Sequence, residues 1–155
     1  MKDDDPRLRT LVLWMKHLLL VACGGAVGAV TRWAVGGWVL HHSTRWTMPA
    51  WLLHRQDSTF PFGTLAVNLI GCLLAGILAG ISIRTARVPA DLQLFLMTGI
   101  LGGFTTFSAF GVDTAYLLGR REFFAAFSYV LVSVVGGIAI LFVTLTAIVK
   151  TASRG

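Results

Sequence analysis

Four long apolar stretches dominate the chain, and the segments between them contain most of its charged residues, prolines and histidines. The apolar stretches run over Leu18–Leu40, Phe62–Ile83, Leu92–Leu118 and Phe123–Val149. Because about 20 mainly apolar residues in an α-helix cross the hydrocarbon core of a bilayer, each stretch is long enough to form one membrane span. The pattern therefore predicts an all-α integral membrane protein with four transmembrane helices.

The parts of the chain outside the four stretches are too short to form a soluble domain. We expect a polar N-terminal extension at 1–16, which is mobile or forms a short helix at the membrane surface. A single four-helix membrane domain follows at 17–150, with a C-terminal tail at 151–155. The connections at 83–91 and 118–122 are short, which favours antiparallel packing of the helices they join.

Composition agrees with a membrane protein, since 55% of the residues are hydrophobic and only 13% are charged. The net charge of +6 comes from basic residues near the ends of the spans, where they suit lipid headgroups. No basic face is interleaved with aromatic residues, so we expect no nucleic-acid partner. Cys23 and Cys72 both fall inside spans, where they act as small packing residues rather than as a disulfide.

The distribution of basic residues gives a weak signal for orientation. With four spans, one side of the membrane has eight lysines and arginines and the other side has five. Without the three in the distal N-terminal extension, the count is five against five. Basic loops normally stay on the cytoplasmic side, so this near balance suggests insertion in either orientation, with two copies meeting head to tail. The full count still favours one orientation.

The third span contains the segment GGFTTFSAF, residues 102–110, which is a poor composition for an uninterrupted helix. We expect a broken helix near the bilayer midplane, with free backbone carbonyls that suit an alkali cation. Phe107 and Phe110 are three residues apart and lie on one helical face. Aromatic edges have partial positive charge, so the two rings could line an anion path. Plain packing is the alternative for both rings.

Four further polar side chains within the spans are candidates for a functional role. Asn68, Tyr129 and Ser133 could line a polar pathway, or each could simply form a hydrogen bond to a neighbouring helix. Arg32 lies deep enough that it must extend to the membrane surface or contact an anionic partner. Histidines of the loop between the first two spans have spacing that favours a solvated loop over a metal site: His41, His42 and His54.

Three motifs resemble the Fluc family of fluoride channels, also called CrcB. They are GAVGAVTRW at Gly25–Trp33, GTLAVNLIG at Gly63–Gly71 and TGILGGFTTFSAF at Thr98–Phe110. The resemblance extends over all four spans in order. It implies a homodimer of two oppositely inserted subunits in the bacterial inner membrane, surrounded by lipid. Such a dimer has two pathways through which fluoride leaves the cytoplasm passively.

The resemblance also assigns roles to individual residues. The carbonyls of Gly102 and Thr105 would bind a structural sodium ion together with the same atoms of the second subunit. Ala109 stands where many family members have threonine, a change that we expect to be mild. Gly137 stands where a third hydroxyl is common on the last helix, so the inner end of the polar track lacks that donor. The side chains expected along the fluoride pathway are Arg32, Asn68, Thr106, Phe107, Phe110, Tyr129 and Ser133.

Two other functions fit a small four-span protein. A proton-coupled multidrug-type exporter needs a buried carboxylate in its first span, but that span contains Arg32 and no acid. A non-transporting assembly subunit would explain the glycine-rich helices but not Asn68 or the GGFTTFSAF segment. An enzyme is the least favoured class, because no span contains a paired nucleophile and base.

Overall fold

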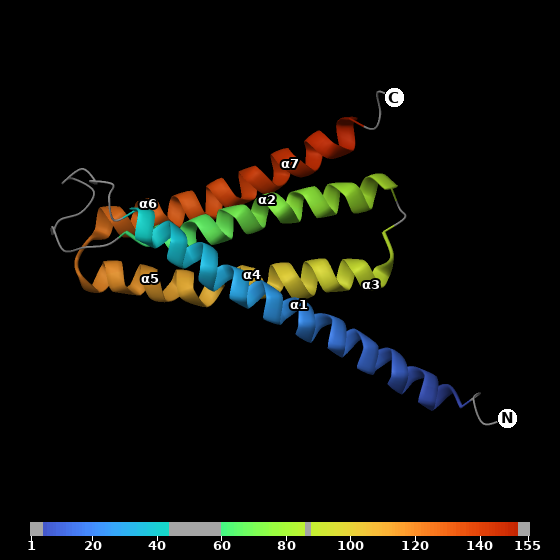
Figure 1. Cartoon of the computed structure of the whole chain (residues 1–155). Coiled ribbons are helices and arrows are strands. Elements are labelled where there is room, and N and C mark those ends of the chain that lie inside the picture. The colour runs from blue at the N-terminus through green and yellow to red at the C-terminus, as the bar shows by residue number, and fades with distance from the viewer. Residues whose placement is uncertain (1–4, 44–59, 86–87, 152–155) are drawn as a thin grey trace.

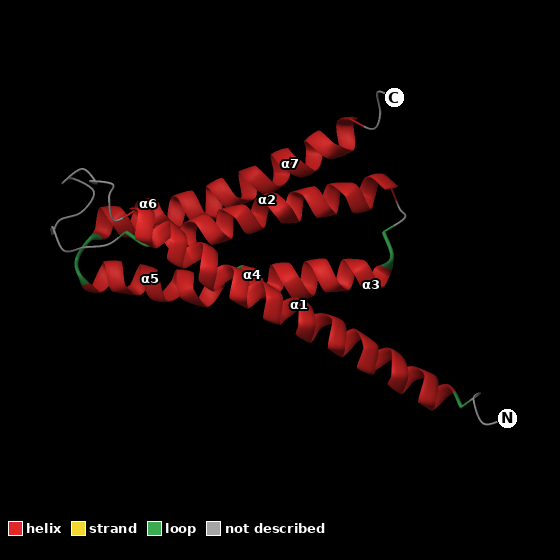
Figure 2. Ribbon diagram, viewed as in Figure 1, coloured by secondary structure: helices red, strands yellow, loops and turns green. Residues whose placement is uncertain are grey.

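The computed structural model describes residues 5–43, 60–85 and 88–151, and regular structure in these ranges is helical (Figures 1 and 2). Four helical segments are long and apolar enough to cross a membrane, which confirms the four predicted spans. Their bounds are Pro6–Ser43, Phe62–Thr85, Ala90–Gly119 and Phe123–Thr151. The sequence-based boundaries agree with these except at the N-terminus.

The first helix, α1 (Pro6–Ser43), begins well before the expected boundary near Leu18. Asp5 defines its start, since its carboxylate accepts the Arg7 backbone N–H at 2.9 Å. Pro6 suits the first helical position, where its missing N–H costs nothing. Residues 6–16 therefore continue the helix of the first span, and Figure 1 shows them projecting past the other helices.

The second span is a single helix, α2 (Phe62–Thr85), which packs along the fourth span. A β-carbon added to Gly76 would lie 2.7 Å from the Leu141 carbonyl oxygen, so only glycine permits this backbone approach. The fourth span is composed of α6 (Phe123–Leu131), the π-helical segment η2 (Val132–Gly136) and α7 (Gly137–Thr151).

The third span changes geometry along its length. Thr105 and Thr106 have extended dihedral angles, with ψ of 156° at Thr105 and φ of −148° and ψ of 112° at Thr106. These two residues separate the helical segments before and after them. In order, the segments are α3 (Ala90–Gln93), the π-helical η1 (Leu94–Leu101), α4 (Gly102–Phe104) and α5 (Phe107–Gly119).

Glycines bring α1 and the third span into direct backbone contact. A β-carbon on Gly24 would lie 2.9 Å from the Gly99 Cα, and one on Gly103 would lie 2.5 Å from the Gly25 carbonyl oxygen. Small residues allow such approach between membrane helices, where van der Waals packing replaces the hydrophobic effect as the main source of association. This contact places the middle of α1 beside Thr105 and Thr106.

Candidate functional site

Asn68 of α2 pairs with the extended backbone of Thr106. Its Oδ1 accepts the Thr106 N–H at 2.8 Å, and its Nδ2 donates to the Thr106 carbonyl oxygen at 3.1 Å. One side-chain amide thus satisfies both backbone groups of a residue that has left the helix, as membrane burial requires. The interhelical hydrogen bond that the sequence left open for Asn68 is present, and the second N–H of its amide is left for another partner.

The same pairing changes the bonding of Gly102. In a continuous α-helix the Thr106 N–H would donate to the Gly102 carbonyl, four residues earlier. Because that N–H donates to Asn68 instead, the Gly102 carbonyl loses its helical donor. Gly102 is exposed in the single chain. The Thr105 carbonyl oxygen accepts from Arg32 Nη1 at the long distance of 3.5 Å, so it also has lone-pair capacity left.

The side chain of Thr106 starts α5. Its hydroxyl oxygen accepts the Ala109 backbone N–H at 3.2 Å, which is the bond of a helix N-cap. It also lies 3.2 Å from the Ser108 hydroxyl. Thr106, which the sequence predicts along the polar pathway, is therefore also the N-cap of the helix that begins at Phe107.

Aromatic rings from α5 and from neighbouring segments form a continuous row. The centroid of Phe107 lies 5.5 Å from that of Phe110, which lies 5.3 Å from that of Tyr129. Tyr129 in turn lies edge-on to Phe60, at 5.7 Å. Phe107, at one end of the row, is 83% exposed, whereas Tyr129 is fully buried. The predicted shared face of Phe107 and Phe110 is confirmed, and the row also includes Tyr129.

The two predicted hydroxyls of the fourth span differ in their surroundings. The Tyr129 hydroxyl donates to the Asp113 carboxylate at 3.3 Å. The Ser133 hydroxyl is buried and has no hydrogen-bond partner among the described residues. An unpaired buried hydroxyl costs free energy, so Ser133 is the more available donor of the two.

Gly137, one turn further along, faces α2. A β-carbon there would lie 3.1 Å from the Cys72 sulfur and 3.9 Å from Leu69 Cδ2. A serine at this position would therefore meet α2 rather than an open path. The absence of a hydroxyl at residue 137 thus permits close packing of the second and fourth spans.

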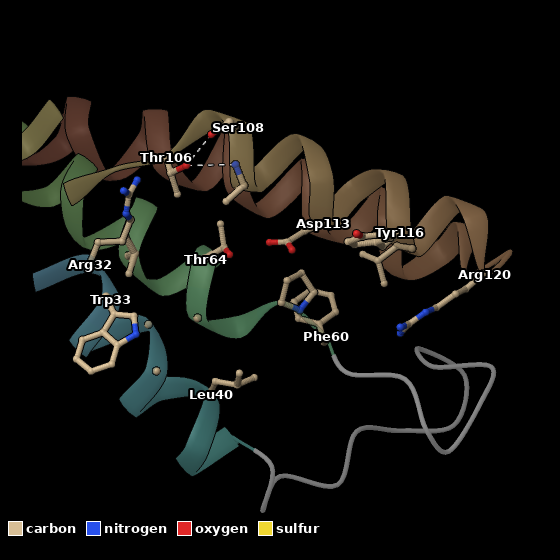
Figure 3. A pocket seen from close by; sticks show the side chains of 17 residues that line it. Arg32, Trp33, Leu40, Phe60, Thr64, Thr106, Ser108, Asp113, Tyr116 and Arg120 are labelled. Carbon is tan, nitrogen blue, oxygen red and sulfur yellow. Dashed lines mark hydrogen bonds between the residues drawn. The ribbon is translucent and has the colours of Figure 1, made fainter. Parts of the chain in front are cut away.

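An open cavity of about 610 Å³ lies between the C-terminal half of α1, the start of α2 and α5. Figure 3 shows Arg32 at one end and Arg120 at the other, with Asp113 between them. Thr106 and Ser108 line the end near Arg32. The cavity therefore extends from the segment that pairs with Asn68 to the C-terminal end of α5. Its lining includes two arginines and one aspartate.

Besides the predicted Thr106, the α5 side of this cavity includes four residues that were not predicted as site residues, although their spacing was a signal. They recur at helical spacing from Thr106 onward and line the cavity together: Ala109, Asp113, Tyr116 and Arg120. The aromatic residues Phe107 and Phe110 occupy a different face of the same helix. The helical period alone does not show which face borders a hollow, because that depends on the position of α1.

The two loop histidines that the structure describes do not form a metal site with other described residues. His41 and His42 lie in the last turn of α1, where His42 Nδ1 is 2.8 Å from the Trp38 carbonyl oxygen, and His54 lies outside the described residues. Among residues 5–43, 60–85 and 88–151, no group of three histidine, cysteine, aspartate or glutamate side chains could bind a metal ion. A cation at this site would need backbone oxygens.

Residues 19–145, which include the whole site, match a known protein family described as "CrcB-like protein, Camphor Resistance (CrcB)". The chain belongs to the CrcB family. A protein of Methylobacillus flagellatus is 39% identical over 127 residues, which cover 82% of this chain and 90% of that protein. A Rhizobium etli protein is 44% identical over 77% of this chain and 86% of its own length. An Agrobacterium fabrum protein is 41% identical over 83% of this chain and 92% of its own length.

All three relatives carry the name "Fluoride-specific ion channel FluC". These matches confirm the resemblance inferred from the three motifs. The CrcB family is one of ion channels rather than enzymes, and this member is a multi-pass membrane protein with four apolar helices.

Proposed function

We propose that this chain is a fluoride-selective channel of the bacterial inner membrane, through which fluoride leaves the cytoplasm down its electrochemical gradient. The names of the CrcB relatives support the choice of ion. The observation that carries the proposal is the Asn68–Thr106 pair, in which the amide keeps one N–H for an ion, next to the Ser108 hydroxyl and the exposed ring of Phe107.

Fluoride is small and strongly hydrated, so a pathway must replace its water with donors in series. Sites must also be weak enough for the ion to leave, which disfavours a ring of lysines. Asn68 has one amide N–H beyond the two bonds to Thr106, and Ser133 has a hydroxyl without a partner among the described residues. The exposed edge of Phe107 adds a weaker positive surface.

The proposed channel is a homodimer of two oppositely inserted copies. Phe107 and Gly102 belong to the functional segment but are exposed in the single chain. A second copy against this surface would enclose the pathway, as a selective channel requires. Two-fold symmetry of such a dimer would also bring equivalent carbonyls from both copies to one axis.

A structural sodium ion fits the oxygens near that axis. Gly102 contributes a carbonyl without its helical donor, and Thr105 contributes one with only a long contact to Arg32. Neutral carbonyl oxygens are hard ligands, which suit an alkali cation. We expect that replacing sodium with a large organic cation during purification shifts the protein from dimer to monomer in size-exclusion chromatography.

The proposed ion selectivity is tested with purified protein in liposomes loaded with potassium fluoride. Valinomycin should start rapid fluoride efflux, whereas chloride-loaded vesicles should release their anion at the rate of protein-free vesicles. Equal rates for the two ions, or no fluoride efflux, would overturn the proposal. Phe107→Ile should slow efflux while leaving the dimer intact.

Asn68→Ala tests the central pair more directly. It leaves the Thr106 N–H and carbonyl without their partner, which we expect to cost about 1–3 kcal/mol of unfolding free energy and to slow fluoride efflux. Thr114→Val is the matched control, because the Thr114 hydroxyl bonds only to the Phe110 carbonyl of its own helix, at 2.8 Å. If Asn68→Ala loses stability but conducts like wild type, Asn68 has a structural role only.

A further inference from the structure

The first third of α1 extends beyond the packed bundle and is not explained by ion conduction. At 38 residues, α1 is about 57 Å long, whereas a bilayer with its headgroups is only about 40–45 Å thick. Lys16 Nζ contacts the Asp91 carboxylate, and His17 Nε2 lies 3.2 Å from the same group, at the start of the third span. Residues 6–15 lie beyond this last contact, as Figure 1 shows.

This segment has two faces of different chemistry. Leu8, Leu11, Val12 and Met15 recur at helical spacing on one face and are 53%, 57%, 62% and 57% exposed. Lys16 and His17 contact Asp91, so this apolar face points away from the third span. The side facing the third span also includes Arg9 and Thr10, with Leu13 as its one large apolar residue.

The apolar face is continuous with the lipid-facing surface of the first span. Leu18 and Leu19 follow on the same side and are 68% and 59% exposed, as expected for side chains in contact with acyl chains. Trp14, at the edge of this face, is 72% exposed, and tryptophan prefers the membrane–water interface. The apolar face of residues 6–15 therefore continues into a surface of the first span that suits contact with lipid.

We infer that residues 6–16 form an interfacial helix that binds the phospholipid headgroup layer and anchors α1. Its apolar face enters the acyl boundary, and its cations, including Arg7, meet the phosphates. From Pro6 to Ser43 the helix contains no aspartate or glutamate, which suits anionic phosphates. Figure 1 shows α1 crossing the other helices obliquely, so its N-terminal part diverges from the bundle. The segment precedes residues 19–145, which match the family.

Spin labels on opposite faces test this placement in the full-length protein. In a Cys23→Ala, Cys72→Ala background, Leu11→Cys and Met15→Cys place labels on the apolar face, and Thr10→Cys places one on the opposite face. The protein is reconstituted in vesicles of phosphatidylcholine and phosphatidylglycerol. Collisions with oxygen, which concentrates in lipid, are compared with collisions with an aqueous nickel chelate.

We expect the ratio of oxygen to nickel collisions to be severalfold higher at residues 11 and 15 than at residue 10. High nickel accessibility at all three positions would mean that the segment projects into water, and it would overturn the inference. Low accessibility to both reagents at residues 11 and 15 would mean that protein covers this face, which would overturn it as well. The three labelled positions are exposed, so the labelled variants should elute like their unlabelled Cys23→Ala, Cys72→Ala parent in size-exclusion chromatography.

Discussion

Gly28 allows one added methyl group to test the contact between α1 and the third span. A β-carbon at this position would lie 2.2 Å from the Ile100 carbonyl oxygen and 2.8 Å from the Phe104 nitrogen. Both are backbone atoms, so no side-chain rotation relieves the overlap. In Gly28→Ala, α1 must move away from the backbone that leads into Thr105 and Thr106.

The expected cost follows from comparison with Gly37→Ala in the same helix. A β-carbon on Gly37 would have nothing within 4 Å, so that variant gains only the helix propensity of alanine over glycine, about 0.5–1 kcal/mol. Gly28→Ala gains the same amount but overpacks the interface, which costs about 1–3 kcal/mol. The propensity gain cancels in the comparison, so Gly28→Ala should be less stable than Gly37→Ala by about 1–3 kcal/mol.

Titration of the folded protein with SDS in mixed micelles, followed by circular dichroism, measures this difference. We expect Gly37→Ala to unfold at or above the wild-type SDS fraction and Gly28→Ala to unfold below it. Fluoride efflux should fall in Gly28→Ala, because that substitution displaces the third span. Equal stability of the two variants would refute the close approach of α1 to Ile100.

Two further predictions concern the site. A β-carbon on Gly71 would lie 2.2 Å from Thr105 Cγ2, so Gly71→Ala should lower stability and efflux. Adding Thr105→Ser, which removes that methyl, should restore most of the loss in a double-mutant cycle; purely additive effects would contradict the contact. Arg120 lines the cavity, whereas the neighbouring Arg121 does not. Arg120→Gln should therefore slow efflux at low ionic strength more than Arg121→Gln, and the difference should shrink above about 0.1 M salt, where charges are screened within about 10 Å. Equal effects would argue against this cavity as the route of approach.

The number of spans and the family could both be predicted from the amino-acid sequence alone. Span number depends on the length of apolar runs, which is a local property. The shared face of Phe107 and Phe110 was predictable for the same reason, since a spacing of three residues is enough to place both rings on one side of a helix. The departure from helical geometry near Thr105 and Thr106 also had a local signal, in the glycines and hydroxyl residues around it.

The pairing of polar groups, in contrast, depends on how the helices pack and could not be predicted from the sequence. Asn68 and Thr106 are 38 residues apart, and Lys16 and Asp91 are 75 apart, so no local pattern links them. The orientation of Gly137 toward Cys72 likewise depends on how α7 lies against α2. A helical period gives the relative angles of side chains on one helix, but not the rotation of that helix against its neighbours. That rotation depends on backbone contacts at glycines, and it decides which hydroxyls and amides are satisfied and which remain available to an ion.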